Sequence, residues 1–331
     1  MNDFVTVTDP PALDRLSETV ARSLLAGAAS YQARFQAAKP FRYIVIDGFF
    51  TDAVAEALLR DFPAFDAERA RNEFGDIGGK AVHEDIAAIS DSYAHLYHVL
   101  GSEPFLSLIS RLTGIAGLLH DPRMYGGGTH DNRHGQELDP HIDFNYDPPT
   151  KLHRRLNLLV YLNKEWRPEW GGQIELHSNP RRPAENQVIS LEPAFNRAVI
   201  FETNEISWHG FPRIDLPPDK HHLSRKSLSV YLYSKDRPAH EKGPEHGTFY
   251  VQRWLPPHIR AGHILTEADV LALEDLLSRR DSWIEHYQRE ELRASAFAGG
   301  LHEQIAALRG RAADPFGIHR LRDGLRHRFG I

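Results

Sequence analysis

The first third of the chain has apolar residues at helical spacing. Asp9, Pro10 and Pro11 form a helix start, and the apolar positions that follow predict a helix to about residue 37; they are Leu13, Leu16, Val20 and Leu24. The apolar run 42–50 predicts a strand. Residues 64–90 are polar and predict loop with a little helix. The segments 54–62 and 93–119 predict further helices, the second broken near Gly101 and Gly114.

From residue 121 the pattern changes to short strands separated by turn residues. Four segments have strand composition and no helix between them: 155–163, 172–178, 197–203 and 227–234. This order predicts an antiparallel sandwich or barrel. After about residue 250 helical spacing returns, behind a capping-box pattern at Thr266 and Asp269. The segment 309–328 is net basic and is interpreted as a solvated or docked tail.

Composition narrows the function classes. With 331 residues, one catalytic core with extensions is expected. The net charge of −6 is too mild to indicate nucleic acid or a membrane surface as a partner. No cysteine is present, which excludes disulfides, thiol catalysis and cysteine-ligated metals. Without a visible signal peptide or a long apolar run, a soluble, cytoplasmic protein is predicted. The 20 histidines make a histidine-ligated metal worth seeking.

His141 and Asp143 stand two residues apart after Pro140, in the stretch DPHIDFNYD. Residues i and i+2 of a strand project from the same face, so both side chains could reach one ion. His209, in WHGFP, is the candidate third ligand. Two imidazoles and one carboxylate leave three open positions in an octahedron, as in non-heme Fe(II) oxygenases, although the same ligands also suit zinc.

A cosubstrate that chelates the metal needs a partner for its remote carboxylate. Arg225 and Ser227 are two residues apart on the predicted strand SRKSLSVYLY, so an arginine fork and a hydroxyl face the same way. The neighbouring Lys226 points to the opposite face by strand parity.

These motifs, in this order, resemble the Fe(II)/2-oxoglutarate-dependent dioxygenases, most closely the prolyl-4-hydroxylase-like branch. Further family-like stretches are MYGGGTH (124–130), RRLNLLVYLN (154–163), WGGQIEL (170–176) and NRAVIF (196–201). The likeness spans residues 121–238; segment 214–223 looks like a loop insertion, and the tail after 250 lies outside it. The resemblance implies a mainly β core with helices: a double-stranded β-helix, or jelly-roll barrel similar to cupins.

The expected organisation is a helical lead-in with one or more core strands (1–120), the catalytic core (121–250) and a helical C-terminal extension (251–331). The extension could line a substrate entrance or form a homodimer interface.

By this resemblance His141, Asp143 and His209 would hold Fe(II), while Arg225 and Ser227 would bind 2-oxoglutarate. Tyr125, expected on the strand before the HID motif, would reach the cosubstrate. Four further residues are predicted to line the substrate pocket: Asn145, Arg155, Asn157 and Trp208, the last because it adjoins His209. O2 is the implied oxidant and ascorbate the implied reductant.

The expected reaction is hydroxylation of an unactivated C–H, with release of succinate and CO2. The retained carboxylate of Asp143 argues against halogenation, and Tyr231 in place of a second arginine argues against nucleic-acid dealkylation. An amino acid, a peptide, a carrier-bound intermediate or a sugar would all fit as substrate. The alternatives are a metal-binding or sensory barrel without turnover, a zinc hydrolase on a similar barrel, and desaturation or epimerisation in place of hydroxylation.

Overall fold

A computed structural model describes residues 11–71, 80–256 and 258–313. The chain divides into two compact units, Met1–Trp254 and Leu255–Ile331. The helices of the first unit are α1 (Pro11–Thr19), α2 (Arg22–Ala37), α3 (Asp52–Arg60), α4 (Asp91–Leu100) and α5 (Glu103–Thr113). Its short 3-10 turns are Glu68–Ala70, Ile86–Ala88, Pro168–Trp170, Pro218–Lys220 and Ala239–Glu241.

The strands of the first unit form two sheets in which every pairing between strands is antiparallel. The larger sheet has the order β1-β9-β6-β11-β4-β2, with β3 also paired to β11. Its strands are β1 (Tyr43–Asp47), β2 (Ala81–His83), β3 (Leu119–His120), β4 (Gly128–Asn132), β6 (His153–Tyr161), β9 (Arg197–Glu202) and β11 (Arg225–Ser234).

The smaller sheet has the order β12-β5-β10-β7-β8. Its strands are β5 (Leu138–Ile142), β7 (Ile174–His177), β8 (Val188–Leu191), β10 (Trp208–Phe211) and β12 (Phe249–Tyr250). Two antiparallel sheets supported by N-terminal helices form the double-stranded β-helix type of core, which confirms the predicted fold class. The four strand segments predicted after residue 155 correspond to β6, β7, β9 and β11.

The predicted single helix to residue 37 is wrong in one respect, because it is two helices. Val20 forms an isolated bridge with Phe50, and the N–H of Ala21 donates to the carbonyl of Phe49 at 3.0 Å. These contacts interrupt the helical hydrogen bonding, so that α1 and α2 are separate helices. The helix start predicted at Asp9 lies outside the described residues.

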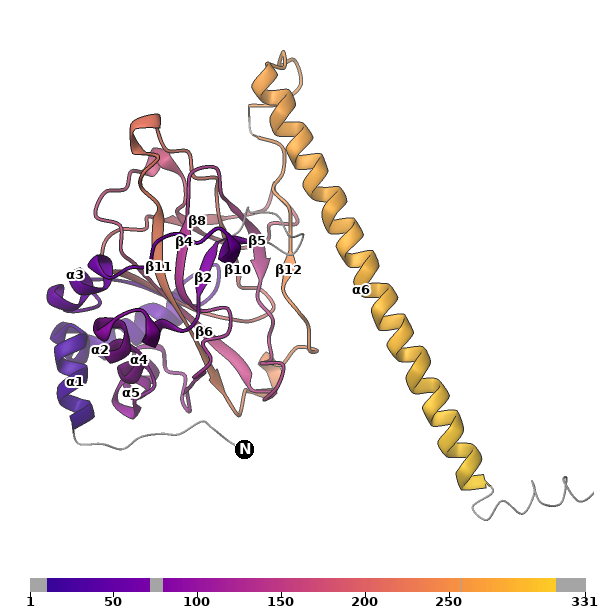
Figure 1. Cartoon of the computed structure of the whole chain (residues 1–331), viewed down its shortest axis with the longest axis horizontal. Coiled ribbons are helices and arrows are strands. Elements are labelled where there is room, and N and C mark those ends of the chain that lie inside the picture. The colour runs from indigo at the N-terminus through magenta and orange to yellow at the C-terminus, as the bar shows by residue number, and fades with distance from the viewer. Residues whose placement is uncertain (1–10, 72–79, 257, 314–331) are drawn as a thin grey trace, which may run out of the picture. The chain divides into compact units, whose positions relative to one another are not determined.

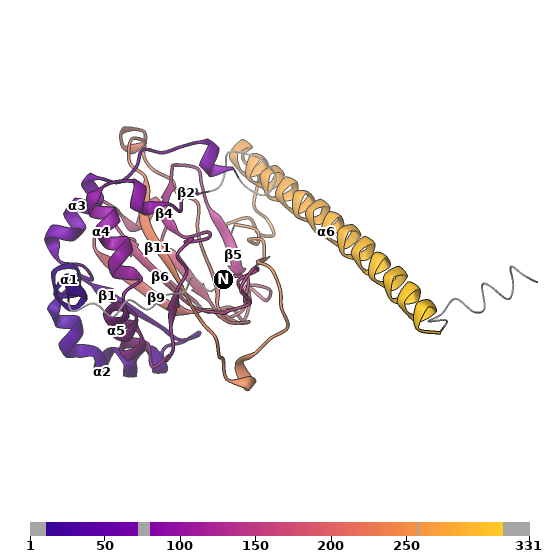
Figure 2. The same cartoon turned by 60° about the horizontal axis from the view of Figure 1, so that its bottom comes forward.

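Strand parity separates an apolar layer from a polar layer. Helices α1–α5 gather on one side of the larger sheet (Figures 1 and 2). Alternate residues of β6 and β11 join the buried apolar cluster on that side: Leu156, Leu158, Val160, Leu228, Val230 and Leu232. The residues between them, such as Asn157 and Ser227, project toward the smaller sheet. Functional side chains therefore lie between the two sheets.

The second unit contains α6 (Glu267–Ala313). The predicted capping box is confirmed: the backbone N–H of Thr266 donates to Asp269 Oδ2 at 2.8 Å, and the N–H of Asp269 donates to Thr266 Oγ1 at 3.2 Å. In the part of the chain that the structure describes, no helix combines the length and apolar character needed to cross a membrane.

Candidate active site

His141, Asp143 and His209 come together between the sheets. His141 on β5 pairs directly with His209 on β10, and their ring centroids are 4.2 Å apart. Asp143 Oδ1 lies 3.8 Å from His141 Nε2, and Oδ2 lies 3.6 Å from His209 Nε2. Ligand atoms about 2.1 Å from a metal, on adjacent octahedral corners, are about 3 Å apart. The three groups thus surround a point that one ion could occupy after a small contraction.

The hydrogen bonds of the two histidines leave the correct nitrogens free. His141 Nδ1 lies 2.9 Å from the carbonyl of Asp139, and His209 Nδ1 lies 2.9 Å from the carbonyl of Ser207. Because a carbonyl only accepts, each Nδ1 carries the proton and each Nε2 keeps its lone pair toward Asp143. Burial, with the nearby His209, lowers the pKa of His141 to about 3, and burial also lowers the pKa of His209. Both rings are neutral at pH 7, as metal binding requires.

Two side chains of β6 hold the carboxylate of Asp143. Arg154 Nη2 lies 3.0 Å from Oδ2, and Asn157 Nδ2 donates to the same oxygen at 2.8 Å. Burial alone would raise the pKa of Asp143, but the charge of Arg154, the two histidines and the hydrogen bond from Asn157 together outweigh it, and the net shift is downward. The guanidinium of Arg154 is held between aromatic rings, 3.7 Å from the centroid of Tyr231 and 4.5 Å from that of Phe144.

A β-bulge brings Arg154 to this position. On β11, Leu232 pairs with Leu156, but the next residue, Tyr233, pairs with Arg154. Arg155 is therefore the extra residue of the bulge. It reverses the side of the sheet toward which the residues before it point. Bulges often redirect a side chain next to a functional site.

Arg225 is a buried cation beside the same cavity. Its Nε donates to the carbonyl of Gly172 at 2.6 Å and its Nη2 to the hydroxyl of Tyr161 at 3.0 Å, while the guanidinium lies 4.4 Å from the Phe211 ring. Among the described residues no carboxylate lies within 4.0 Å of it. Burial lowers the pKa of Arg225, because no counterion in the described part of the chain offsets the cost of burying its charge. Ser227, two residues along β11, also lines the cavity.

The cavity between these groups has a volume of about 50 Å³. On this measure one buried water takes roughly 10–15 Å³. It is lined by the three candidate ligands, by Arg225 and Ser227, and by polar and apolar neighbours from both sheets. Lys80, at the edge of the described segment before β2, adds a second cation.

His130 and Tyr231 line the cavity and were not predicted to do so. Both are anchored on the carbonyl of Gly126, His130 through Nε2 at 3.0 Å and Tyr231 through its hydroxyl at 2.9 Å. His130 Nδ1 then accepts from Ser229 Oγ at 2.9 Å. The sequence could have indicated this, because Ser229 and Tyr231 are an even number of residues from Arg225 and so lie on the same face of the strand.

Asn157 lines the cavity, whereas Tyr125 does not. Tyr125 lies in the turn before β4, not on a strand; it is 49% exposed, and its ring faces Phe144 at 5.9 Å. It is not among the residues that line the cavity.

Asn145, Arg155 and Trp208 do not line this cavity either. Asn145 Nδ2 donates to Glu205 Oε1 and to the carbonyl of Pro244, so the amide braces loops. Arg155, the bulge residue, donates to Glu241 at 3.2 Å. Trp208 precedes a ligand and so faces the other side of β10, with Arg181 4.9 Å above its ring.

One further group of metal-type donors occurs among the described residues: His258, His263 and Asp269. The two Nε2 atoms lie 2.7 and 2.9 Å from the Asp269 oxygens, which are hydrogen-bond distances. Together with the bonds from Thr266 they complete the cap of α6. These nitrogen–oxygen distances are shorter than those between Asp143 and its two histidines. The hydrogen bonds of the helix cap therefore account for the cluster without a metal ion.

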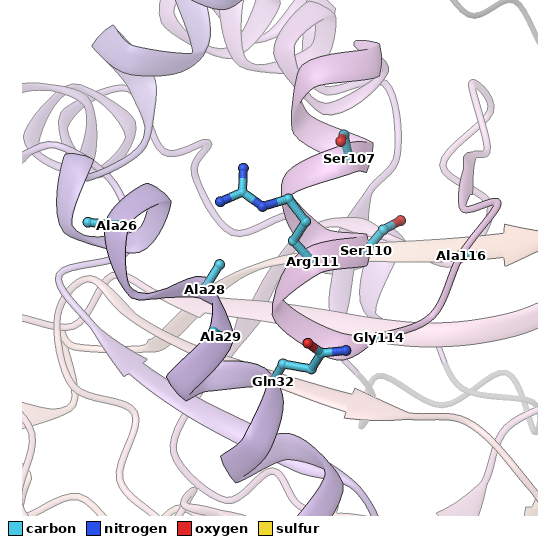
Figure 3. Close-up of a pocket in the computed structure, with 9 residues that line it drawn as sticks. All are labelled: Ala26, Ala28, Ala29, Gln32, Ser107, Ser110, Arg111, Gly114 and Ala116. Atoms are coloured by element: carbon cyan, nitrogen blue, oxygen red, sulfur yellow. The ribbon is translucent and has the colours of Figure 1, made fainter.

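A second hollow, of about 520 Å³, lies between α2 and α5 (Figure 3). Its lining consists of small side chains with Gln32 and Arg111, and no carboxylate or imidazole belongs to it. It therefore lacks the groups needed for metal or acid–base chemistry.

Several solved structures are similar to this chain. A prolyl hydroxylase from Trichoplax adhaerens, in complex with a hypoxia inducible factor peptide fragment, has 17% identity and a TM-score of 0.45, over 67% of this chain and 96% of its own. A Pseudomonas putida prolyl-4-hydroxylase has 12% identity and a TM-score of 0.39, over 64% and 94%. HygX from Streptomyces hygroscopicus, with nickel and 2-oxoglutarate bound, has 12% identity and a TM-score of 0.39, over 73% and 96%.

Residues 127–243 match the family described as the 2OG-Fe(II) oxygenase superfamily. This segment contains the candidate ligands His141, Asp143 and His209, and it confirms the resemblance seen in the sequence. Fe(II) and 2-oxoglutarate are the metal and cosubstrate that the family implies. Residues 127–243 are therefore a 2OG-Fe(II) oxygenase domain that carries the candidate triad.

Proposed function

We propose that this chain is a 2-oxoglutarate-dependent dioxygenase that hydroxylates an unactivated C–H bond. The substrate class is an amino acid, a peptide, a carrier-bound intermediate or a sugar. His141, Asp143 and His209 hold Fe(II), and Arg225 with Ser227 binds the 5-carboxylate of 2-oxoglutarate. When bound, the iron and cosubstrate supply the oxidation: R–H, 2-oxoglutarate and O2 give R–OH, succinate and CO2.

The observation that carries the proposal is the buried guanidinium of Arg225. A buried cation without a carboxylate partner is costly unless a ligand supplies the anion. It lies in the same cavity as the candidate triad, so a dicarboxylate could bridge the two. A planar arginine fork suits a carboxylate, and the ring of Phe211 fixes its plane.

The remaining residues of the chain orient the reactants and exclude water. Arg154 and Asn157 fix the rotamer of Asp143, and the backbone carbonyls of Asp139 and Ser207 fix the two imidazoles. Apolar side chains complete the wall: Leu138, Leu159, Ile174 and Phe211. Water is thereby kept from the site where the substrate bond is oxidised.

The test is an anaerobic titration of the full chain with Fe(II) and 2-oxoglutarate, followed by the metal-to-ligand charge-transfer band. We expect Arg225→Gln to raise the Kd for 2-oxoglutarate by roughly 10–100-fold, because a charged hydrogen bond contributes about 1.5–3 kcal/mol. Binding of Fe(II) alone should not change.

Lys226→Gln is the matched control, since Lys226 is adjacent but bonds to Ser224 on the opposite face of β11. An unchanged titration in Arg225→Gln would contradict the cosubstrate assignment. A band that persists in His141→Ala would contradict the ligand assignment. Turnover that needs no O2, with zinc bound, would instead support the hydrolase alternative.

A further inference from the structure

Helix α6 carries a long apolar seam on its surface. From Val270 to Leu308, ten of the twelve positions at alternating spacings of three and four residues are apolar: Val270, Leu273, Leu277, Ile284, Tyr287, Ala294, Ala298, Leu301, Ile305 and Leu308. Seven of these are large side chains that are more than a third exposed: Val270, Leu277, Ile284, Tyr287, Leu301, Ile305 and Leu308.

This spacing has the 3.5-residue period of a coiled coil. A seven-residue repeat keeps its apolar positions on one narrow stripe only when the helix winds around a partner helix. The seam runs for more than five repeats, where three or four already indicate a coiled coil. An exposed apolar stripe of this length indicates an interface.

The seam is interrupted by two charged residues, Arg280 and Glu291. Both are exposed, and neither makes an ion pair with another described residue. They stand at equal distances on either side of the point midway between Ile284 and Tyr287. A polar residue within an apolar seam often fixes the orientation and register of the partner.

We propose that α6 pairs with α6 of a second copy of this chain, in antiparallel orientation, centred between Ile284 and Tyr287. In this register Arg280 of each copy faces Glu291 of the other, so two ion pairs flank an Ile284–Tyr287 centre. Leu277 then faces Ala294, Leu273 faces Ala298, and Val270 faces Leu301. Large side chains thus meet small ones in the two layers next to the ion pairs.

The same residues make a parallel arrangement of the two helices unfavourable. It would place Arg280 against Arg280 and Glu291 against Glu291, and like charges at an interface oppose association. The two layers of alanine would also face each other and leave the seam underpacked. Charge and side-chain size therefore favour the same orientation.

Charge reversal tests the pairing in the full chain by analytical ultracentrifugation. We expect a dimer for the unchanged protein at micromolar concentration. Arg280→Glu or Glu291→Arg alone should weaken dimerisation roughly 100-fold or more, because each creates two like-charge contacts. The double variant should restore it, since the opposite charges face each other again. Arg289→Glu, on the outer face of the heptad, is the control and should leave the dimer intact.

The absence of cysteine from the sequence allows a second test of orientation. Val270→Cys and Leu301→Cys proteins, mixed and oxidised, should form a disulfide-linked heterodimer. Each alone should not cross-link, because in the antiparallel pair identical positions are about 46 Å apart along the helix. A monomeric unchanged protein, a double variant that fails to restore the dimer, or cross-linking of Val270→Cys alone would each overturn the proposal.

Discussion

Arg154 and Arg155 are adjacent and both are buried, yet their guanidinium groups lie in different parts of the core. Arg154 reaches Asp143 Oδ2 at 3.0 Å, whereas Arg155 reaches Glu241 at 3.2 Å. Regular alternation would place Arg155 on the cavity side with Asn157. Because of the bulge, Arg154 points to that side instead. Strand alternation in the sequence does not predict this.

We expect Arg154→Met to weaken Fe(II) binding by roughly 10–100-fold, because residues that orient a metal ligand typically contribute this much. Arg155→Met is the matched control. It should lower the free energy of unfolding by removing the ion pairs of Arg155 with Glu241 and Glu202, although both carboxylates keep Arg42 and Arg237 as partners. It should not change the Kd for Fe(II) of the folded protein. Equal losses of metal affinity in both variants would contradict the assignment.

The buried His120 is expected to make the stability of the fold depend on pH. Burial lowers the pKa of His120 to about 4 from an ordinary value of 6.5. The folded state therefore binds fewer protons than the unfolded state, so the stabilising contribution is complete above pH 6.5 and is lost as the pH falls toward 4. The loss is about 3 kcal/mol for this group.

His120→Phe keeps a ring against Tyr97 and cannot take up a proton. Urea unfolding at pH 7 and pH 4.5 should show a smaller loss of stability in this variant than in the unchanged protein. Other buried histidines, such as His130, contribute in the same direction to both proteins. An equal loss in the two proteins would show that His120 does not titrate as stated.

At the scale of elements, the glycine that begins β4 sets how closely β2 and β4 approach. Gly128 has a φ of +86°, and a Cβ there would lie 2.0 Å from the carbonyl oxygen of His83. Gly117 has a φ of +67° but no atom within 4 Å of a Cβ. A side chain at Gly117 would therefore cause backbone strain alone, whereas one at Gly128 would cause both strain and steric overlap.

We expect Gly117→Ala to lower the free energy of unfolding by about 1 kcal/mol through strain alone. Gly128→Ala should cost at least about 2 kcal/mol more, because the β2–β4 pairing must open. It should also weaken 2-oxoglutarate binding, since Gly128 leads into the strand of His130. Similar values for the two variants in denaturant unfolding would contradict this account.

Local patterns predicted most elements, because strand parity and helix periodicity are set by burial of one face. The three candidate ligands and the Arg225–Ser227 pair were predictable for the same reason. Tyr125, Asn145 and Trp208 lie away from the cavity, because their positions depend on turns and loop contacts between distant segments. The division between α1 and α2 similarly depends on Phe50, thirty residues from Val20.

At the scale of the molecule, the matched family segment does not form its sheets alone. Strands β1, β2 and β12 lie outside residues 127–243, yet they pair with β9, β4 and β5. Tyr250 of β12 stacks on His141 with ring centroids 5.1 Å apart. Segments on both sides of the family match therefore support the candidate iron site.

The division at Trp254 provides a prediction at this scale. A chain ending at Trp254 retains β12 and every cavity residue, so we expect it to bind Fe(II) and 2-oxoglutarate with unchanged Kd. It lacks α6 and should be monomeric at concentrations where the full chain is dimeric. Loss of cosubstrate binding on this truncation, measured by the anaerobic titration, would contradict the independence of the first unit.

The uncompensated charge of Arg225 has a thermodynamic consequence. Without a ligand, the buried charge lowers the stability of the folded state. A bound anion offsets this cost, and it binds only the folded state. By mass action, a ligand at one hundred times its Kd adds about 2.7 kcal/mol to the stability of the folded chain. The lifetime of this protein against unfolding and proteolysis should therefore rise and fall with the supply of 2-oxoglutarate around it.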